Sequence, residues 1–255
     1  MLKDKIVFIT GASSGIGEAC AKVMAREGAK LILCARRIDK INALSKELKK
    51  EFGTASFCFA LDVRNQPDVA KAVESLPAEW RAIDILINNA GLSRGLAKLH
   101  EADLNDWEEM IDTNVKGLLY VSRAILPGMV KRKSGHVVNI GSVAGHQLYP
   151  GGNVYCATKH AVDAITQGMQ IDLVDTPIRV STVDPGMVDT EFSTVRFHGD
   201  EEKAKTVYTG LTPLAGEDIA ETVLFCVTRP PHVNIHQVHI MPKAQAAATI
   251  SHRKR

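Results

Sequence analysis

A tyrosine and a lysine stand four residues apart, at Tyr155 and Lys159, a spacing that places both side chains on one face of a helix. A free phenol has a pKa of about 10 and is a poor base at neutral pH. One positive charge about 4 Å away is worth roughly 4 kcal/mol at an effective dielectric constant of about 20, which corresponds to about three pKa units. Lys159 is therefore expected to help bring Tyr155 into the range of a general acid or base.

Two further polar residues fall where such a pair would need them. Ser142 follows the apolar run 136–140, at the carboxyl edge where parallel α/β sheets bind ligands. Asn114 lies on the apolar stripe of a helix that begins near Asp103, and the rest of the stripe is Trp107, Met110, Ile111, Leu118, Val121 and Ile125. A buried amide needs hydrogen-bond partners, so Asn114 is either a site residue or a structural amide of the core.

A glycine-rich turn near the N-terminus predicts a phosphate site. The apolar run 6–9 leads into residues 10–17, which read Thr-Gly-Ala-Ser-Ser-Gly-Ile-Gly, and then into a helical pattern. In this order Gly11 makes the tight turn, Gly15 lets the main chain approach a phosphate, and Gly17 lets the helix pack close to the strand. The free N–H groups of the new helix face the anion. The alternative is a structural glycine turn of another α/β protein.

The end of the second apolar run indicates the preferred cofactor. Residues 31–35 are followed by Arg36 and Arg37, and no carboxylate appears before Asp39. In dinucleotide-binding folds an acidic residue at this place binds the ribose 2′-hydroxyl, whereas an arginine accommodates a 2′-phosphate. Two guanidinium groups therefore favour NADP over NAD. The alternative is two solvated arginines on a surface loop.

Apolar β-rich runs alternate with longer amphipathic runs along the whole chain. We expect strands at 6–9, 31–35, 56–61, 83–87, 136–140, 179–183 and 236–241. This alternation predicts an α/β fold with a doubly wound parallel sheet covered by helices on both faces. No repeat or linker divides the chain, so one domain is expected over residues 1–242. Residues 243–255 form a C-terminal tail, which is either a short helix, a free tail or a subunit contact.

Composition narrows the class of protein. The 255 residues are 45% hydrophobic and 24% charged with a net charge of +2, which suits one enzyme-sized domain and argues against nucleic-acid binding. The basic cluster 252–255 is expected to be a solvated tail. Five isolated cysteines indicate reduced thiols in a cytoplasmic protein, without disulfides or metal-ligand spacing. The charged residues 3–5 leave no room for a signal peptide, and we expect no membrane partner and no metal.

In these residues the chain resembles the short-chain dehydrogenase/reductase family across nearly its whole length. The resemblance rests on the glycine motif at 10–17, on Asn-Asn-Ala-Gly at 88–91, and on a tetrad made of Asn114, Ser142, Tyr155 and Lys159. It implies a single Rossmann-like domain with a seven-stranded parallel sheet, an NADP-dependent oxidoreductase acting on CH–OH donors, and a homotetramer.

The resemblance also implies roles. Tyr155 is the general acid/base, Ser142 steadies the reacting oxygen, Lys159 binds the nicotinamide ribose and lowers the tyrosine pKa, and Asn114 holds a water in a proton relay. The positions expected to bind the cofactor are Gly11, Ser13, Ser14, Gly15, Ile16, Gly17, Arg36, Arg37, Asp62, Val63, Asn88, Ala90, Tyr155, Lys159, Pro185, Gly186, Val188 and Thr190.

Three segments, 76–80, 151–155 and 191–197, resemble a narrower subgroup, the NADP-dependent 3-hydroxy acid dehydrogenases, which oxidise serine, allo-threonine and related acids. This implies interconversion of a short 3-hydroxy acid and its 3-oxo form by hydride transfer, with 3-hydroxypropanoate among the candidates. Two alternatives stay open. One is an NADPH-dependent reductase of uncharged carbonyls such as sugars, diketones or steroids, and the other is a cofactor-binding sensor, against which the intact tetrad argues.

Residues 190–212 lie where this fold places a lid, and they contain one arginine, Arg196. An anionic substrate in a partly closed site needs a compensating cation, and the planar guanidinium suits a carboxylate. We therefore expect Arg196 to bind substrate together with Ser142 and Tyr155, with help from Tyr149 and His198. The alternative is a structural ion pair between Arg196 and Glu191.

Overall fold

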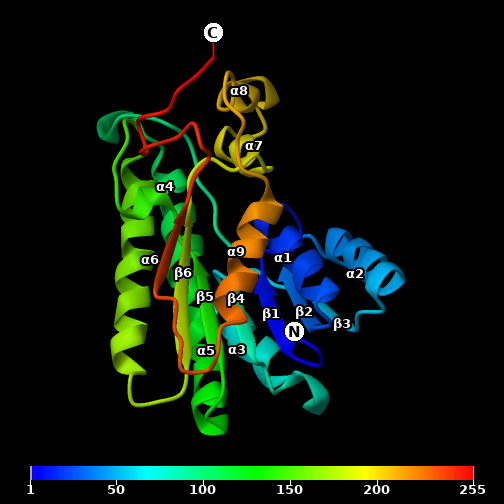
Figure 1. The fold of residues 1–255 in the computed structure, drawn as a ribbon. Helices are drawn as coiled ribbons and strands as arrows, with labels where there is room; N and C mark the ends of the chain where they lie inside the picture. The colour runs from blue at the N-terminus through cyan, green and yellow to red at the C-terminus, as the bar shows by residue number, and fades with distance from the viewer. Residues whose placement is uncertain (1, 255) are drawn as a thin grey trace.

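A computed structural model describes residues 2–254, in which seven parallel strands form one sheet in the order β3-β2-β1-β4-β5-β6-β7 (Figure 1). The strands are β1 (Ile6–Thr10), β2 (Lys30–Ala35), β3 (Ser56–Ala60), β4 (Ile85–Asn88), β5 (His136–Ile140), β6 (Arg179–Pro185) and β7 (Gln237–Ile240). Every predicted strand is present, with ends shifted by two residues at most. The predicted α/β fold is therefore confirmed.

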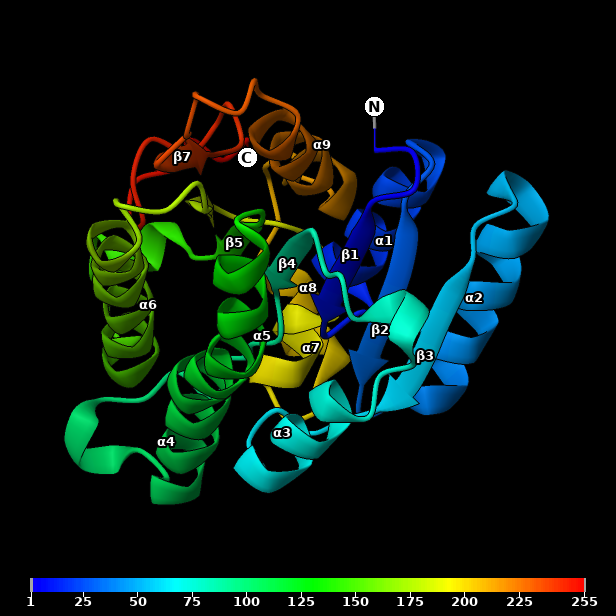
Figure 2. The ribbon, with the colours of Figure 1, turned by 90° about the horizontal axis from the view of Figure 1, so that it is seen from below.

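Helices cover both faces of the sheet because successive side chains of each buried strand point to opposite faces (Figure 2). In β1, Val7 and Ile9 pack on one face with α1 (Gly15–Arg26), α2 (Ile38–Phe52) and α9 (Gly216–Val227). Ile6 and Phe8 face the other way, where side chains of α3 (Gln66–Glu74), α5 (Leu118–Arg132) and α6 (Asn153–Asp172) pack. The remaining helices are η1 (Ala78–Trp80), η2 (Leu99–Glu101), α4 (Leu104–Ile111), η3 (Asp112–Gly117), η4 (Val143–Gly145), α7 (Phe192–Arg196) and α8 (Glu201–Thr206).

The helix predicted from Asp103 onward is not continuous. Asp103 caps α4, since its carboxylate accepts a hydrogen bond from the Asn105 N–H at 2.8 Å. A π-helical turn, η3, then separates α4 from α5, and it contains Asn114. The wider turn shifts the helical register, so Ile111, which was predicted on the buried stripe, is 36% exposed while Asn114 is buried.

The C-terminal tail folds back over the carboxyl edge of the sheet, where α7 and α8 also lie (Figure 1). Gln245 is buried and its Oε1 accepts a hydrogen bond from the Met187 N–H at 2.8 Å. Arg253 donates to the Thr209 carbonyl at 2.7 Å and to the Val207 carbonyl at 3.0 Å. Arg253 is exposed, as expected for a solvated basic tail, but these hydrogen bonds hold it against residues 207–209, and residue 255 lies outside the described residues.

Two other expectations concern the whole chain. All five cysteines are free thiols, and four of them are buried. Among residues 2–254, no helix combines the length and the hydropathy that crossing a membrane requires.

Candidate active site

A cleft of about 590 Å³ opens at the carboxyl edge of the sheet, near the neighbouring strands β1 and β4. At these two strands the order of the strands in the sheet reverses its direction along the chain, which is where such folds bind ligands. Loops after six strands line it together with α7 and the tail. The sequence-predicted residues along this cleft are Gly11, Ser13, Ser14, Gly15, Ile16, Arg36, Arg37, Asp62, Val63, Ala90, Ser142, Tyr149, Tyr155, Lys159, Pro185, Gly186, Val188, Thr190 and Arg196. Four predicted residues, Gly17, Asn88, Asn114 and His198, are not among the lining residues.

The glycine turn has the geometry that a phosphate cradle needs. Gly11 and Gly15 have φ values of 66° and 58°, which side chains disfavour. A Cβ atom at Gly11 would lie 2.9 Å from the Ala90 Cα, and one at Gly17 would lie 2.4 Å from the Gly11 carbonyl oxygen. Gly17 therefore permits close packing of α1 behind the turn instead of lining the cleft. The Asn89 amide holds the turn by donating to the Gly11 carbonyl at 3.1 Å.

An anion-binding cluster stands beside this turn. The Arg37 guanidinium donates to the Ser14 hydroxyl at 2.7 Å and to the Ser13 hydroxyl at 3.1 Å. Arg37 and Lys40 each hold the Glu191 carboxylate at 2.7 Å, and hydrogen bonds from Lys40 and then Arg37 lower the pKa of Glu191 to about 2. Lys40 was missed in the sequence. The available signal was its position three residues after Arg37, in the first turn of α2.

Arg36 turns away from Arg37. Its guanidinium is half-exposed and lies 3.5 Å from the Glu109 carboxylate on α4. Arg94 donates to the same carboxylate at 2.6 Å, and this hydrogen bond is the main reason that the pKa of Glu109 is lowered. Asp62 at the end of β3 lines the cleft and is held by Arg64 through hydrogen bonds of 2.6 to 3.0 Å. The two adjacent arginines thus face the cleft from different sides.

Three members of the tetrad meet in the cleft. Tyr155 and Lys159 lie on α6, and Ser142 caps η4 through a hydrogen bond from the Ala144 N–H at 3.1 Å. The Lys159 ammonium donates to the Ile140 carbonyl at 2.9 Å and lies 6.0 Å from the centre of the Tyr155 ring. The helical spacing therefore places the phenol and the ammonium on one side, as predicted.

Burial dominates the electrostatics of the pair. Burial raises the pKa of Tyr155 above its ordinary value, against the opposing effects of the Arg196 charge and a hydrogen bond with Ser142. Burial also lowers the pKa of Lys159 to about 8, with the charge of Asp184 acting in the opposite direction. Desolvation is the largest influence on the Tyr155 pKa here, and the expectation that Lys159 together with an oxidised nicotinamide ring lowers this pKa stays a prediction.

Asn114 stands behind the cleft. Its Oδ1 accepts from the Leu92 N–H at 2.8 Å, and its Nδ2 donates to the Leu92 carbonyl at 2.8 Å and to the Thr158 hydroxyl at 3.0 Å. The π-helical turn aims this amide at the loop after β4 and at α6. These hydrogen bonds agree with the alternative in which Asn114 is a structural amide of the core. Its role in a proton relay stays a prediction.

Asn88 does not contact the cleft, contrary to its predicted role in cofactor binding. Its side-chain amide donates to the Ser122 hydroxyl and to the Asn139 Oδ1, both at 2.9 Å and both buried. Asn88 therefore ties β4 to β5 and α5. The neighbouring residues Asn89 and Ala90 reach the cleft instead.

Arg196 points from α7 into a group of aromatic rings. Its guanidinium carbon lies 5.0 Å from the Phe192 ring centre, 5.4 Å from that of Tyr155 and 5.8 Å from that of Tyr149. Nη2 donates to the Tyr149 hydroxyl at 3.0 Å, whereas the buried Nε has no hydrogen-bond partner. A buried donor without a partner is costly, so this guanidinium is suited to an added acceptor.

The alternative ion pair between Arg196 and Glu191 is absent, since Glu191 binds Arg37 and Lys40 on the other side of the lid. Within residues 2–254, no carboxylate forms an ion pair with Arg196. His198 does not assist in the cleft, because its Nε2 lies 3.2 Å from Asp106 on α4. Arg196 is therefore the lid cation that remains available to an anion in the cleft.

This sheet, glycine turn and Ser-Tyr-Lys group are those of a short-chain dehydrogenase. The sequence model described as "short chain dehydrogenase" matches residues 5–201. The chain therefore belongs to the short-chain dehydrogenase family and is an oxidoreductase, which confirms the resemblance predicted from the motifs.

Particular relatives are similar over nearly the full length. The NADP-dependent 3-hydroxy acid dehydrogenase YdfG of Salmonella typhi is 49% identical over 247 residues, which are 96% of this chain and 98% of that protein. The NADP-dependent 3-hydroxy acid dehydrogenase of Schizosaccharomyces pombe is 43% identical, with 99% and 98% of the two chains covered. The closed form of serine dehydrogenase complexed with NADP+ has a TM-score of 0.91 at 45% identity, covering 98% of this chain and 100% of that chain.

Proposed function

We propose that this protein is an NADP-dependent dehydrogenase that interconverts a short 3-hydroxy acid and its 3-oxo form. The observation that carries the proposal is the Arg196 guanidinium, which lies 5.4 Å from the Tyr155 ring without a carboxylate partner among the described residues. A carboxylate bound there would have its neighbouring carbons close to the Tyr155 and Ser142 hydroxyls. The 3-hydroxy acid and serine dehydrogenases among the relatives support the same substrate class.

NADP is the cofactor, as the names of the relatives and the NADP+ complex support. The residues fit it: the turn at Gly11 and Gly15 leads into the N-terminus of α1, a suitable place for a pyrophosphate, and the cations Arg37 and Lys40 already hold a carboxylate where a 2′-phosphate is expected. When bound, the nicotinamide supplies the acceptor or donor of the hydride. Lys159 lines the same cleft and is placed to bind the nicotinamide ribose.

The chain itself handles the proton. In oxidation Tyr155 takes the proton of the substrate hydroxyl, and Ser142, which hydrogen-bonds with Tyr155, steadies the reacting oxygen. The raised pKa of Tyr155 means that the phenol keeps its proton in this state, which suits the reverse reaction, carbonyl reduction, directly. For oxidation the phenolate must gain stabilisation from added positive charge, and Lys159 and Arg196 lie 6.0 Å and 5.4 Å from the centre of the Tyr155 ring.

The cluster of Arg37 and Lys40 is expected to select NADP. Replacing Arg36, Arg37 and Lys40 by neutral residues should raise the KM for NADP by at least one to two orders of magnitude, since even one charged hydrogen bond to phosphate is worth about 1.5–3 kcal/mol. The KM for NAD should change little, because NAD carries no 2′-phosphate. Steady-state kinetics with both cofactors measure the two values.

Single variants separate the three residues. Arg37→Gln and Lys40→Gln should each raise the KM for NADP more than Arg36→Gln does. The Arg36 guanidinium is half-exposed and pairs with Glu109. Lys50→Gln, an exposed lysine at the far end of α2, serves as the matched control. An equal loss for NADP and NAD would show that the cluster acts on folding or on the shared pyrophosphate.

We further propose that the protein works in the cytoplasm as a homotetramer. The five free cysteines support a reducing compartment. Large apolar side chains are exposed on α5 and α6, with Leu119 at 40% and Ile171 at 72% exposure, which suits subunit contacts. Light scattering should give about four times the 27.7 kDa of one chain. Leu119→Glu and Ile171→Glu should lower this mass, and a monomeric parent protein would contradict the proposal.

A further inference from the structure

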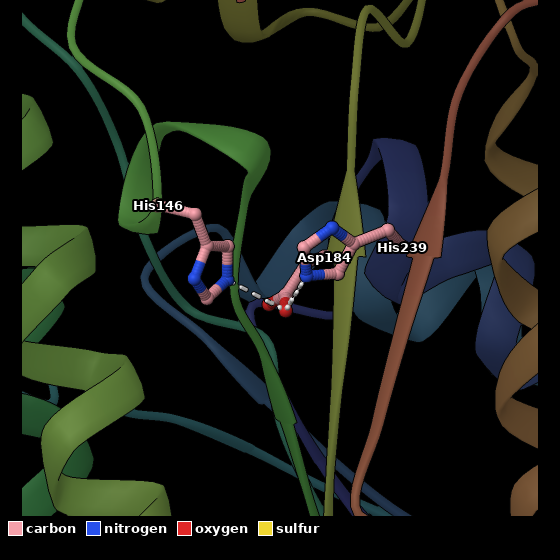
Figure 3. A group of neighbouring side chains, drawn as sticks. All are labelled: His146, Asp184 and His239. Carbon is pink, nitrogen blue, oxygen red and sulfur yellow. Dashed lines mark hydrogen bonds and ion pairs between the residues drawn. The ribbon is translucent and has the colours of Figure 1, made fainter. Parts of the chain in front are cut away.

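Three side chains that could bind a metal converge behind the cleft (Figure 3). His146 comes from the loop after β5, Asp184 from the end of β6 and His239 from β7. Asp184 Oδ2 lies 3.0 Å from His146 Nε2 and 3.5 Å from His239 Nε2, and the three candidate ligand atoms all lie within 4.8 Å of one another. None of the three residues lines the cleft, although the charge of Asp184 opposes the effect of burial on the pKa of Lys159.

The ligand set has a definite chemistry. Two imidazole nitrogens and one carboxylate oxygen suit borderline divalent ions, and the combination of two histidines and a carboxylate with an open position is known for Zn²⁺. A Zn²⁺ ion about 2.0–2.1 Å from each ligand would separate tetrahedral ligand atoms by roughly 3.4 Å. The separations of 3.0 and 3.5 Å around Asp184 are close to that value.

The carboxylate is fixed by its surroundings before any ion is considered. The Asp184 side chain is 2% exposed, and its Oδ1 accepts a hydrogen bond from the Thr182 hydroxyl at 2.8 Å. Gly141 lies against it so closely that a Cβ atom there would sit 1.8 Å from Oδ1. Such support from outside the ligand set orients metal ligands in proteins, and here it turns Oδ2 toward the two imidazoles.

The hydrogen bonds of this cluster leave one close contact between two nitrogen atoms. The Gln237 Nε2 lies 3.1 Å from Asp163 Oδ1 and 2.8 Å from Asp184 Oδ2, so both of its hydrogens have acceptors. The same nitrogen is 3.1 Å from His146 Nε2. If His146 Nε2 is protonated and donates to Asp184 Oδ2, it cannot accept a hydrogen bond from Gln237. His146 Nε2 and Gln237 Nε2 then lie 3.1 Å apart with no hydrogen bond between them. A cation between the imidazoles and Oδ2 would use the lone pair of His146 Nε2.

The rings are also arranged for a shared ion. His146 and His239 are stacked with their centres 4.5 Å apart and their planes 27° apart, and both Nε2 atoms face the same oxygen (Figure 3). His239 is partly exposed, which leaves a route from solvent. We propose that His146, Asp184 and His239 form a binding site for Zn²⁺ or a similar divalent transition-metal ion.

The site would join three segments that are distant in the chain. Bound metal would tie the loop after Ser142 and the end of β6 to β7 at the edge of the sheet. The sequence contained no signal for it, because the ligands come from different elements and have no recognisable spacing. The metal is therefore expected to stabilise the folded protein, without supplying a group to the reaction.

Calorimetric titration of the metal-stripped full chain with Zn²⁺ tests the site. We expect saturable binding of one ion per chain, and a Kd raised at least tenfold in His146→Ala and in His239→Ala, since even residues that only support metal ligands contribute about 10–100-fold. His232→Ala, which removes an exposed histidine outside the cluster, is the matched control and should bind as the parent does. Circular dichroism checks that each variant is folded.

Co²⁺ gives a second readout, because its visible spectrum reports the ligands. Binding through nitrogen and oxygen should produce weak ligand-field bands without a thiolate charge-transfer band, and Zn²⁺ should raise Tm in the parent and in His232→Ala only. Equal Zn²⁺ affinity in all four proteins, a thiolate band, or no saturable binding to the parent would each overturn the proposal. The cluster would then be a hydrogen-bonded ion pair.

Discussion

Replacing Tyr155 by phenylalanine is expected to lower kcat by a factor of about 10²–10⁴, the usual contribution of a positioned acid or base, while NADP still binds. The variant removes one hydroxyl but keeps the ring, which packs edge-to-face on Phe192 with centres 5.7 Å apart. The residues proposed for the phosphates, among them Arg37 and Lys40, lie elsewhere in the site. Steady-state kinetics and a fluorescence titration with NADPH measure the two effects separately.

The matched control for this variant is Tyr120→Phe, which removes a hydroxyl from α5 outside the cleft. It should keep nearly the full rate. If Tyr155→Phe retained more than about a hundredth of the parent rate, the proton would have to move through another group. If the variant lost NADPH binding as well, the Tyr155 hydroxyl would act mainly in binding the cofactor and not in proton transfer.

Replacing Arg196 by methionine is expected to raise the KM for a 3-hydroxy acid by one to two orders of magnitude. Hydrogen bonds to a charged partner are worth about 1.5–3 kcal/mol, and each factor of ten corresponds to about 1.4 kcal/mol. Methionine keeps much of the apolar stem that packs among Tyr149, Tyr155 and Phe192. An uncharged aldehyde or ketone of similar size has no carboxylate to lose, so its KM should hardly change.

A panel of short 3-hydroxy acids and uncharged carbonyls, assayed with both proteins, measures this difference. Lys203→Met is the matched control, because Lys203 is an exposed cation of the same lid that does not line the cleft. Equal damage to both substrate classes would give Arg196 a structural role in holding Tyr149. Better turnover of uncharged carbonyls by the parent protein would favour the alternative reductase.

Local patterns in the chain were sufficient for the fold and for the centre of the site. The apolar runs that became β1, β2, β4, β5 and β6 are buried by neighbouring strands and helices, so their composition marks them, whereas the edge strands β3 and β7 are only partly buried. Gly11 and Gly15 adopt positive φ values that other residues avoid, and Tyr155 and Lys159 share a helical face whatever lies around them. Each of these features depends on residues within a few positions of one another.

Contacts between distant segments decided the remainder. Glu191 pairs with Arg37 and Lys40 and not with Arg196, because the lid, residues 190–212, crosses the cleft to α2. The π-helical turn at Asn114 and the return of Arg253 onto the lid likewise depend on what packs against them. Burial, which no local pattern measures, is the largest influence on the Tyr155 pKa and raises it. The cluster of His146, Asp184 and His239 exists only because the sheet brings β6 and β7 beside the loop after β5.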